Sequence, residues 1–423
     1  MAVKCIISCP ISTYSGYGAR SRDFVRALIN VYPDWDIKIL AQRWGNTRKG
    51  FLEDHNDTDL LSRIIPGLNY KPDVWMQITV PNEFQAVGTF NVGVTAGIET
   101  TICAPEWIEG VNRMDLTLTS SQHAKDVLLN TVYSVTEKST GSVADELRAR
   151  KPIEVCFEGL DADVFKKVTS TINLDDIEED FAFLVIGHWM QGSIGEDRKN
   201  IGYTVKAFCE VFKNKPNPPA LLLKTQQANA SIIDRDQIFN KINSIRSSVK
   251  GKLPNIYLLH GDLSDSRLNE LYNHPKVKAL VSLTKGEGFG RPMLEFGALG
   301  KPMIVSAWSG HMDFLKDNFT KFVSGRLDNV HASAAIEKMI LKEAKWFRPD
   351  DEEVANSFTS VYKNYNKSLA SAKKQSKHIL DNFTLEYMED RIEDIFENYL
   401  PEFPKEVKLE LPKLNLPKLK KIG

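Results

Sequence analysis

Two glutamates, Glu287 and Glu295, are separated by seven residues in the segment KGEGFGRPMLEFGALGKPMIV at 285–305. An apolar stretch at 277–283 predicts a strand before this glycine-rich loop, and Pro292, which suits the first turn of a helix, predicts a helix after it. In an open α/β sheet, ligands bind beyond the carboxyl ends of the strands, where helix amides favour oxygen-rich, anionic groups. The pattern predicts a site for a polyhydroxylated ligand that carries phosphate. The alternative is a glycine-rich turn with two solvated glutamates.

This segment resembles the E-x7-E region of the family 4, or group 1, retaining glycosyltransferases of the GT-B fold. It fits the pattern EGFG-x-P-x-LEA-x-x-x-G-x-P except at Phe296, where the family usually has alanine. The resemblance implies that Glu287 and nearby amides hold the hydroxyls of a donor sugar and that Glu295 holds the donor ribose. It also implies donor contacts from the rest of the loop, at Gly288, Phe289 and Gly290.

Two basic residues, Arg198 and Lys199, follow a predicted strand at 181–186 and lie where a helical pattern begins. An arginine fork and a lysine point charge both suit phosphate oxygens. The alternative is a solvated pair, but positive charge at the start of a helix is electrostatically unfavourable. The resemblance implies that this pair stabilises a departing diphosphate with no required metal. Many relatives have Gly-Arg after the strand where this chain has His188, so either Arg198 replaces that arginine or His188 takes a weaker form of its role.

Further donor contacts are predicted at three positions. Gly16 and Gly18 precede a helical pattern at 20–29, so their amides can face a phosphate. This G-x-G lacks the third glycine of the dinucleotide fingerprint. Lys224 follows a predicted strand at 220–223 and is expected to face the cleft, although a lysine there often only extends its stem along apolar surface.

Two residues are candidates on the acceptor side. Glu99 lies just past a predicted strand at 91–95, near the expected cleft, and many relatives have a histidine close to this point. An acceptor contact therefore suits Glu99 better than catalysis does. His123 begins a predicted helix and is more typical of a surface histidine than of a catalyst.

The chain has 423 residues, too many for one ordinary core, and strand patterns alternate with helix patterns along most of it. We therefore expect an α/β protein with two Rossmann-like domains whose parallel sheets face a central cleft. Strands are predicted at 3–8, 36–40, 73–80, 91–95, 115–118 and 153–156, and again at 181–186, 220–223, 256–259, 277–283 and 302–305. The expected units are an acceptor domain at 1–165, an acidic linker at 166–180, a donor domain at 181–382, a helix at 383–400 and a tail at 401–423.

Three segments stand outside this alternation. Residues 131–150 are polar and predict an exposed excursion, and 368–399 predict a helix that, by the resemblance, crosses back onto the N-terminal domain. The tail contains a Leu-Pro-Lys-Leu repeat, and its prolines exclude a helix. It is either a disordered tail or a basic arm, at 405–423, for an anionic partner.

Composition narrows the class of protein. A formal net charge of −1 argues against a protein that grips polyanions with its whole surface. Five scattered cysteines favour a reducing compartment without structural disulfides, and the eight histidines show no metal-ligand spacing. No apolar run is long enough to span a bilayer, so we expect a cytoplasmic protein without a transmembrane segment.

Together these features predict a glycosyltransferase that uses a nucleotide-diphosphate sugar, with a UDP-sugar favoured, and needs no cofactor or metal. Its catalytic residues would be Glu287, Arg198 and Lys199, and the resemblance implies retention of configuration. A nucleotide-sugar epimerase, a sugar phosphorylase and a non-catalytic sugar-nucleotide binding module are the alternatives. The acceptor stays open between a glycan, a lipid-linked sugar, a protein and modified DNA.

Overall fold

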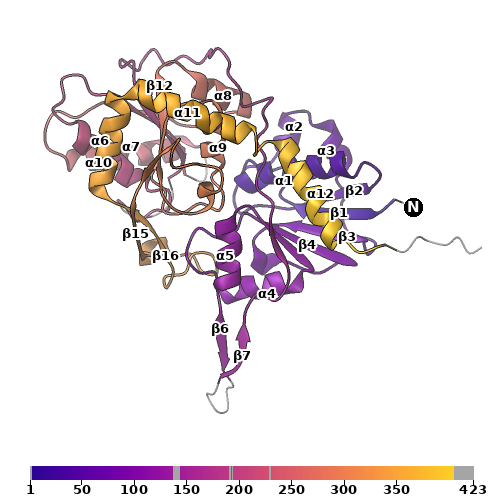
Figure 1. Ribbon diagram of the computed structural model, residues 1–423. Coiled ribbons are helices and arrows are strands. Elements are labelled where there is room, and N and C mark those ends of the chain that lie inside the picture. The colour runs from indigo at the N-terminus through magenta and orange to yellow at the C-terminus, as the bar shows by residue number, and fades with distance from the viewer. Residues whose placement is uncertain (1, 137–142, 190–191, 193, 228–229, 404–423) are drawn as a thin grey trace, which may run out of the picture.

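The computed structural model describes residues 2–136, 143–189, 192, 194–227 and 230–403. Two six-stranded parallel sheets form two Rossmann-like domains, which lie side by side in Figure 1. The predicted fold class, two such domains with a helix that returns to the first, is confirmed.

The N-terminal sheet has the strand order β2-β1-β3-β4-β5-β8. Its strands are β1 (Lys4–Cys9), β2 (Asp36–Ala41), β3 (Val74–Ile78), β4 (Phe90–Thr95), β5 (Leu116–Thr119) and β8 (Ile153–Val155). Most of their residues are buried because helices or loops cover both faces, as is usual for a parallel sheet. The helices of this part are α1 (Gly16–Val31), α2 (Phe51–Asp54), α3 (Thr58–Ser62), α4 (Pro105–Arg113) and α5 (Gln122–Asn130).

The C-terminal sheet has the order β11-β10-β9-β12-β13-β14. Its strands are β9 (Ala182–His188), β10 (Ala220–Gln226), β11 (Ile256–Leu259), β12 (Val277–Ser282), β13 (Met303–Ser306) and β14 (Lys321–Val323). The sequence patterns missed β14 and the antiparallel pair β15 (Gly325–Asn329) and β16 (Lys345–Pro349). The helices are α6 (Ile201–Phe212), α7 (Ile232–Ser247), α8 (Asp265–Asn273), α9 (Arg291–Ala298) and α10 (Asp351–Lys363).

The continuous helix predicted at 368–399 is wrong, because the structure has two helices, α11 (Tyr365–Leu380) and α12 (Leu385–Tyr399). The break is the point at which the chain crosses between domains. There Leu160 donates its backbone N–H to Phe383 O and accepts from Leu385 N, which fixes an extended stretch. Beyond the break, α12 packs along α1 in the N-terminal core, as Figure 1 shows.

The polar segment at 131–150 contains a short antiparallel hairpin, β6 (Tyr133–Thr136) with β7 (Val143–Leu147), which projects from the N-terminal domain in Figure 1. The acidic segment at 166–180 is not wholly at the surface, because Leu174 and Ile177 are buried in the C-terminal core. The predicted basic arm at 405–423 lies outside the described residues. In the part of the chain that is described, no helix has both the length and the apolar character needed to cross a bilayer.

Candidate functional site

A cavity of about 450 Å³ lies at the carboxyl ends of strands from both sheets. Its N-terminal wall includes Tyr14, Gly16, Tyr17, Trp44, Ala96 and Glu99. Its C-terminal wall includes His188, Arg198, Lys199, Lys224, Glu287 and Glu295. The strand–loop–helix order of each domain therefore brings most of the predicted site residues to one space.

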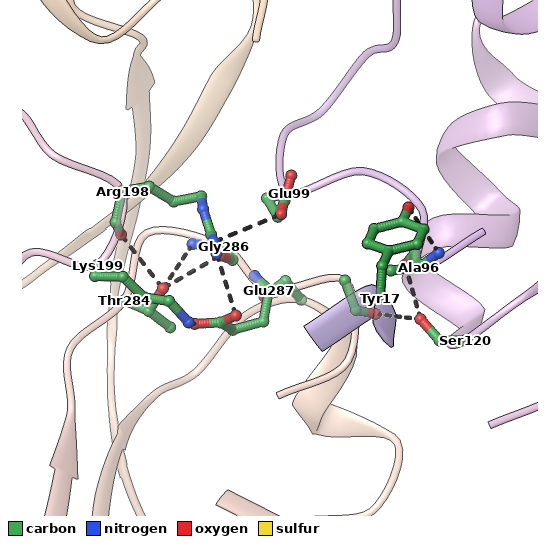
Figure 2. A network of polar contacts seen from close by, with 11 residues as sticks. Tyr17, Ala96, Glu99, Ser120, Arg198, Lys199, Thr284, Gly286 and Glu287 are labelled. Carbon is green, nitrogen blue, oxygen red and sulfur yellow. Dashed lines mark hydrogen bonds and ion pairs between the residues drawn. The ribbon is translucent and has the colours of Figure 1, made fainter. Parts of the chain in front are cut away.

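Glu287 pairs directly with both basic residues, as Figure 2 shows. Lys199 Nζ lies 2.6 Å from Glu287 Oε1, and Arg198 Nη1 lies 3.1 Å from Glu287 Oε2. Arg198 also approaches Glu99 of the N-terminal domain, with 3.7 Å between Nη2 and Oε1. Only 19%, 17% and 8% of the Arg198, Lys199 and Glu287 side chains are exposed. The basic pair and the first glutamate of the motif are thus one ion cluster rather than separate contacts.

The charges of this cluster stabilise one another against burial. Burial alone would raise the pKa of Glu287, but Lys199 and Arg198 outweigh it and lower that pKa to about 2. Burial lowers the pKa of Lys199, and Glu287 offsets only part of this effect. For Arg198 the order is reversed, since Glu99 and Glu287 outweigh burial and raise its pKa. Glu287 is therefore ionised at every physiological pH.

Hydrogen bonds to backbone carbonyl groups hold the basic pair beside the loop that carries Glu287. Asn200, the residue before α6, has a left-handed conformation with φ of 57°, and it turns the chain back toward β12. Its side-chain amide donates to Leu283 O at 3.0 Å. The backbone N–H of Lys285 donates to Arg198 O at 2.8 Å. Asparagine tolerates this conformation better than most residues, so the tripeptide Arg-Lys-Asn is suited to both charge and turn.

The glycines of the motif loop mainly allow the two domains to approach one another. A Cβ added at Gly286 would lie 1.9 Å from Glu99 O, and one added at Gly288 would lie 2.4 Å from Ala96 O. Ser120 and Ser121 both donate their hydroxyls to Gly288 O, at 3.2 and 2.6 Å. These two glycines therefore serve the close approach of another backbone.

The next two loop residues build the start of α9. Gly290 has φ of 106° and precedes the first helical residue. Phe289 is 3% exposed, and its ring lies 4.9 Å from that of Phe314 in the C-terminal core. Both residues reach the wall of the cavity, but their packing is structural.

Glu295 lies in a second ion cluster, which was not predicted from the sequence. Arg291 donates to Glu295 Oε1 at 3.0 Å and to Asp23 Oδ2 at 2.6 Å, and it lies 3.7 Å from Glu158. Tyr272 donates its hydroxyl to the other Glu295 oxygen at 3.3 Å. Burial raises the pKa of Glu295, and Arg291 offsets only part of the rise. Asp23 belongs to α1, so this arginine joins the motif helix to the N-terminal domain.

Some of the remaining candidates line the cavity and others do not. Gly16, Lys224 and His188 line it, and His188 Nδ1 donates a hydrogen bond to Gln227 O at 2.7 Å. Burial lowers the pKa of both His188 and Lys224. Gly18 does not line the cavity. Its N–H donates to Ser15 Oγ, and a Cβ at this position would lie 2.2 Å from Thr13 O, so its role is in the turn before α1.

His123 is also absent from the cavity wall. Its ring packs edge-on against Trp308 with 4.7 Å between centroids, and burial lowers the pKa of His123 to about 4. The imidazole is therefore neutral and structural. Glu99, by contrast, lines the cavity and contacts Arg198. In the described part of the chain, no group of histidine, cysteine, aspartate and glutamate side chains is arranged to hold a metal ion.

Comparison with known proteins gives a family for part of the chain and a fold for nearly all of it. Residues 196–374 match the family described as glycosyl transferases group 1. A search of curated protein sequences found no match.

The solved structures similar to this chain include Alr3699/HepE from Anabaena, in complex with UDP and glucose, at 12% identity and a TM-score of 0.60, covering 94% of this chain and 100% of that one. A glycosyltransferase from Rickettsia africae has 12% identity and a TM-score of 0.61, covering 94% and 99%. Sucrose-phosphate synthase from Thermosynechococcus elongatus gives the same four values.

At 12% identity, the similarity to these structures shows the fold of the chain and no more. The match at 196–374 includes Arg198 and Lys199 before α6, Glu287 in the loop after β12 and Glu295 in α9. The chain thus has the GT-B fold, and residues 196–374 match the model of the group 1 glycosyltransferases.

Proposed function

We propose that this protein transfers a sugar from a nucleotide-diphosphate sugar, most suitably a UDP-sugar, to a hydroxyl of an acceptor, with retention of configuration. The observation that carries the proposal is the ion cluster of Arg198, Lys199 and Glu287 in a cavity lined by both domains. The match of residues 196–374 to group 1 glycosyltransferases supports it, as does the complex of the similar Anabaena protein with UDP and glucose.

The basic pair would stabilise the charge that develops on the leaving diphosphate. Arg198 and Lys199 are largely buried and are held in place by ion pairs, so they need little reorganisation when the glycosidic bond breaks. Such preorganised charge contributes roughly 3–4 kcal/mol per group in comparable sites. A diphosphate is itself an anion, so it would share or take over the basic pair from Glu287. The carboxylate released in this way would accept hydrogen bonds from the donor-sugar hydroxyls.

Glu295, which lines the cavity, would hold the donor ribose. Its position is set by Arg291 and Tyr272, which fix both oxygens. In the proposed retaining reaction, the acceptor oxygen attacks the face from which the diphosphate departs, and the leaving phosphate accepts the acceptor proton. No protein nucleophile is required, so Glu287 orients the sugar rather than attacking it.

The test measures UDP release from a panel of UDP-sugars, with and without a mixture of sugar and glycoside acceptors. Transfer that depends on acceptor, with the product anomer assigned by NMR as that of the donor, is the expected result. Turnover of donor without acceptor and without sugar release would favour an epimerase. Formation of a sugar 1-phosphate from a glycoside and inorganic phosphate, without UDP-sugar, would favour a phosphorylase. Tight UDP-sugar binding with no turnover on any acceptor would favour a binding module and contradict the proposal.

Three further parts of the proposal have their own checks. Activity after treatment with EDTA tests the independence from metal. Fractionation of the cells that produce the protein tests a cytoplasmic location. Deletion of 405–423 followed by heparin chromatography tests the polyanion-binding arm.

A further inference from the structure

A second and larger cavity, of about 780 Å³, lies in the N-terminal domain beside the proposed donor site. It opens at the carboxyl ends of β2, β1 and β3, where Ser8 faces Leu40 on one side and Gln77 on the other. This is the edge at which parallel α/β sheets bind ligands. The volume is within the range of small-molecule sites.

Trp44 lines both cavities. Its ring stacks on that of Tyr17 with 4.0 Å between centroids and 22° between planes. The Tyr17 hydroxyl in turn accepts a hydrogen bond from the Ala96 N–H, as Figure 2 shows. It also bonds to Thr95 Oγ1, and both Tyr17 and Ala96 line the donor cavity. A molecule that rests on Trp44 in the larger cavity would therefore lie next to the proposed donor.

The two sides of the larger cavity differ in charge. The loop after β2 brings two exposed cations, Arg43 and Lys49, to the cavity. Neither side chain forms a hydrogen bond or ion pair with the described residues, although the backbone of Lys49 bridges to Thr13. The third cation of that loop, Arg48, is paired with Asp54 at 2.6 Å and does not line the cavity.

The loop after β3 brings amide and carboxylate groups. Gln77 holds this loop by donating to Glu83 O at 3.0 Å and accepting from Gln85 N at 2.9 Å. Thr79 donates to one oxygen of the Glu83 carboxylate, so the other oxygen can accept from a hydroxyl. Because β2 and β3 flank β1 on opposite sides, the cations and the carboxylate enter the cavity from opposite sides.

A buried donor without a partner is a further sign of a ligand site. Trp75 lines the cavity, is 4% exposed, and its Nε1 has no hydrogen-bond partner. Such a group costs about 1–3 kcal/mol when it stays unpaired.

We propose that this cavity is the acceptor site and that the acceptor is a hydroxyl-bearing molecule with a phosphate group, which Arg43 and Lys49 bind. Trp44 supports its ring next to the donor, and Glu83 accepts from its hydroxyls. This inference rests on the proposed transferase function, since it names the class of molecule that receives the sugar.

The test compares ligands that differ only in phosphate, with the donor cavity blocked by saturating UDP. Glucose 6-phosphate and glucose are titrated calorimetrically into the protein and into the double variant Arg43→Gln/Lys49→Gln. A control variant, Lys71→Gln/Lys167→Gln, removes the same charge from exposed lysines of the chain that lie outside both cavities.

We expect glucose 6-phosphate to bind at least 10-fold more tightly than glucose, and the double variant to lose this preference while the control keeps it. A third titration, with a 12-nucleotide single-stranded DNA, identifies the source of the phosphate. Tighter binding of the DNA indicates a nucleic acid acceptor, and tighter binding of the sugar phosphate indicates a small one. Equal binding of all three probes, no binding of any, or a preference that the double variant retains would overturn the proposal.

UDP binding and UDP-sugar turnover separate this inference from the proposed function. A protein that neither binds UDP nor turns over UDP-sugars fails as a transferase, whatever the larger cavity binds. A protein that transfers sugar to neutral acceptors, with the same kcat/KM in the double variant and the control, is a transferase to which this inference does not apply.

Discussion

Replacing Lys199 by methionine removes the closest charge partner of Glu287 and keeps much of the side-chain volume. The pair is 2.6 Å apart and largely buried, so solvent screens it little. The pKa of Glu287, about 2 against an ordinary value of 4.5, corresponds to about 3 kcal/mol of stabilisation of the carboxylate. Arg198 shares this stabilisation, so we expect Lys199→Met to lower the free energy of unfolding by about 2 kcal/mol.

The double variant Lys199→Met/Glu287→Gln separates stability from catalysis. In Lys199→Met alone, the buried Glu287 carboxylate has lost its closest cation. The double variant replaces this carboxylate by a neutral amide, so at least half of the lost stability should return. Activity should not return, because the leaving diphosphate still lacks a cation. We expect both Lys199→Met and the double variant to lose about 10²–10³-fold in kcat.

Urea unfolding followed by circular dichroism measures the first quantity, and UDP release from the preferred UDP-sugar measures the second. Glu287→Gln alone completes the cycle and gives the coupling energy of the pair. A single variant as stable and as active as the wild type would refute the reasoning. So would a double variant that recovers activity together with stability, since the cluster would then be only structural.

Three further predictions test the rest of the site. The pKa of Glu287 is depressed, so the stability that its carboxylate contributes is present above about pH 4.5 and is lost as the pH falls toward 2. The difference in unfolding free energy between wild type and Glu287→Gln should therefore shrink by about 3 kcal/mol over that range. Asp23→Asn removes the 2.6 Å partner of Arg291 and should raise the KM for the UDP-sugar about 10-fold, at a stability cost of about 1–3 kcal/mol, and an unchanged KM would contradict a role in holding Glu295. Gly288→Ala places a Cβ 2.4 Å from Ala96 O, so small-angle scattering should show a larger radius of gyration and assays a loss of transfer, whereas Gly67→Ala, which meets nothing within 4 Å, should change neither.

The sheets were predictable because parallel strands covered on both faces are continuous apolar runs. The strand predicted at 256–259 coincides with β11, and most others differ by one to three residues at an end. The missed elements lack that signal. Strand β15 (Gly325–Asn329) is mostly exposed and carries Arg326 and Asp328, and β14 has only three residues. The break between α11 and α12 was missed because a helical pattern continues on both sides of it.

The chemistry of the site was less predictable than its location. The sequence identified Glu287, Arg198 and Lys199 as candidates, and the structure brings them within ion-pair distance. Their direct pairing could not be read from residues 88 and 89 positions apart, since it depends on the turn at Asn200. The environment of His123 was equally unpredictable, because its ring contact with Trp308 joins residues 185 positions apart.

The role of Arg291 could not be predicted from the motif. The pattern EGFG-x-P allows any residue at this position, so the resemblance implies no role for it. In the structure it is the only side chain of the motif, within the described residues, that forms an ion pair with α1, and it holds Glu295 with the same guanidinium. Its Nε donates to Glu295 and its Nη1 donates to Asp23, and the fixed angle between these donors is something that lysine does not supply. If Glu295 binds the ribose, then the fit of the donor and the approach of the two domains depend on one side chain. Arg291→Lys, which keeps the charge and loses the fork, should therefore raise the KM for the donor about as much as Asp23→Asn does. An Arg291→Lys variant with wild-type KM would show that charge alone is sufficient.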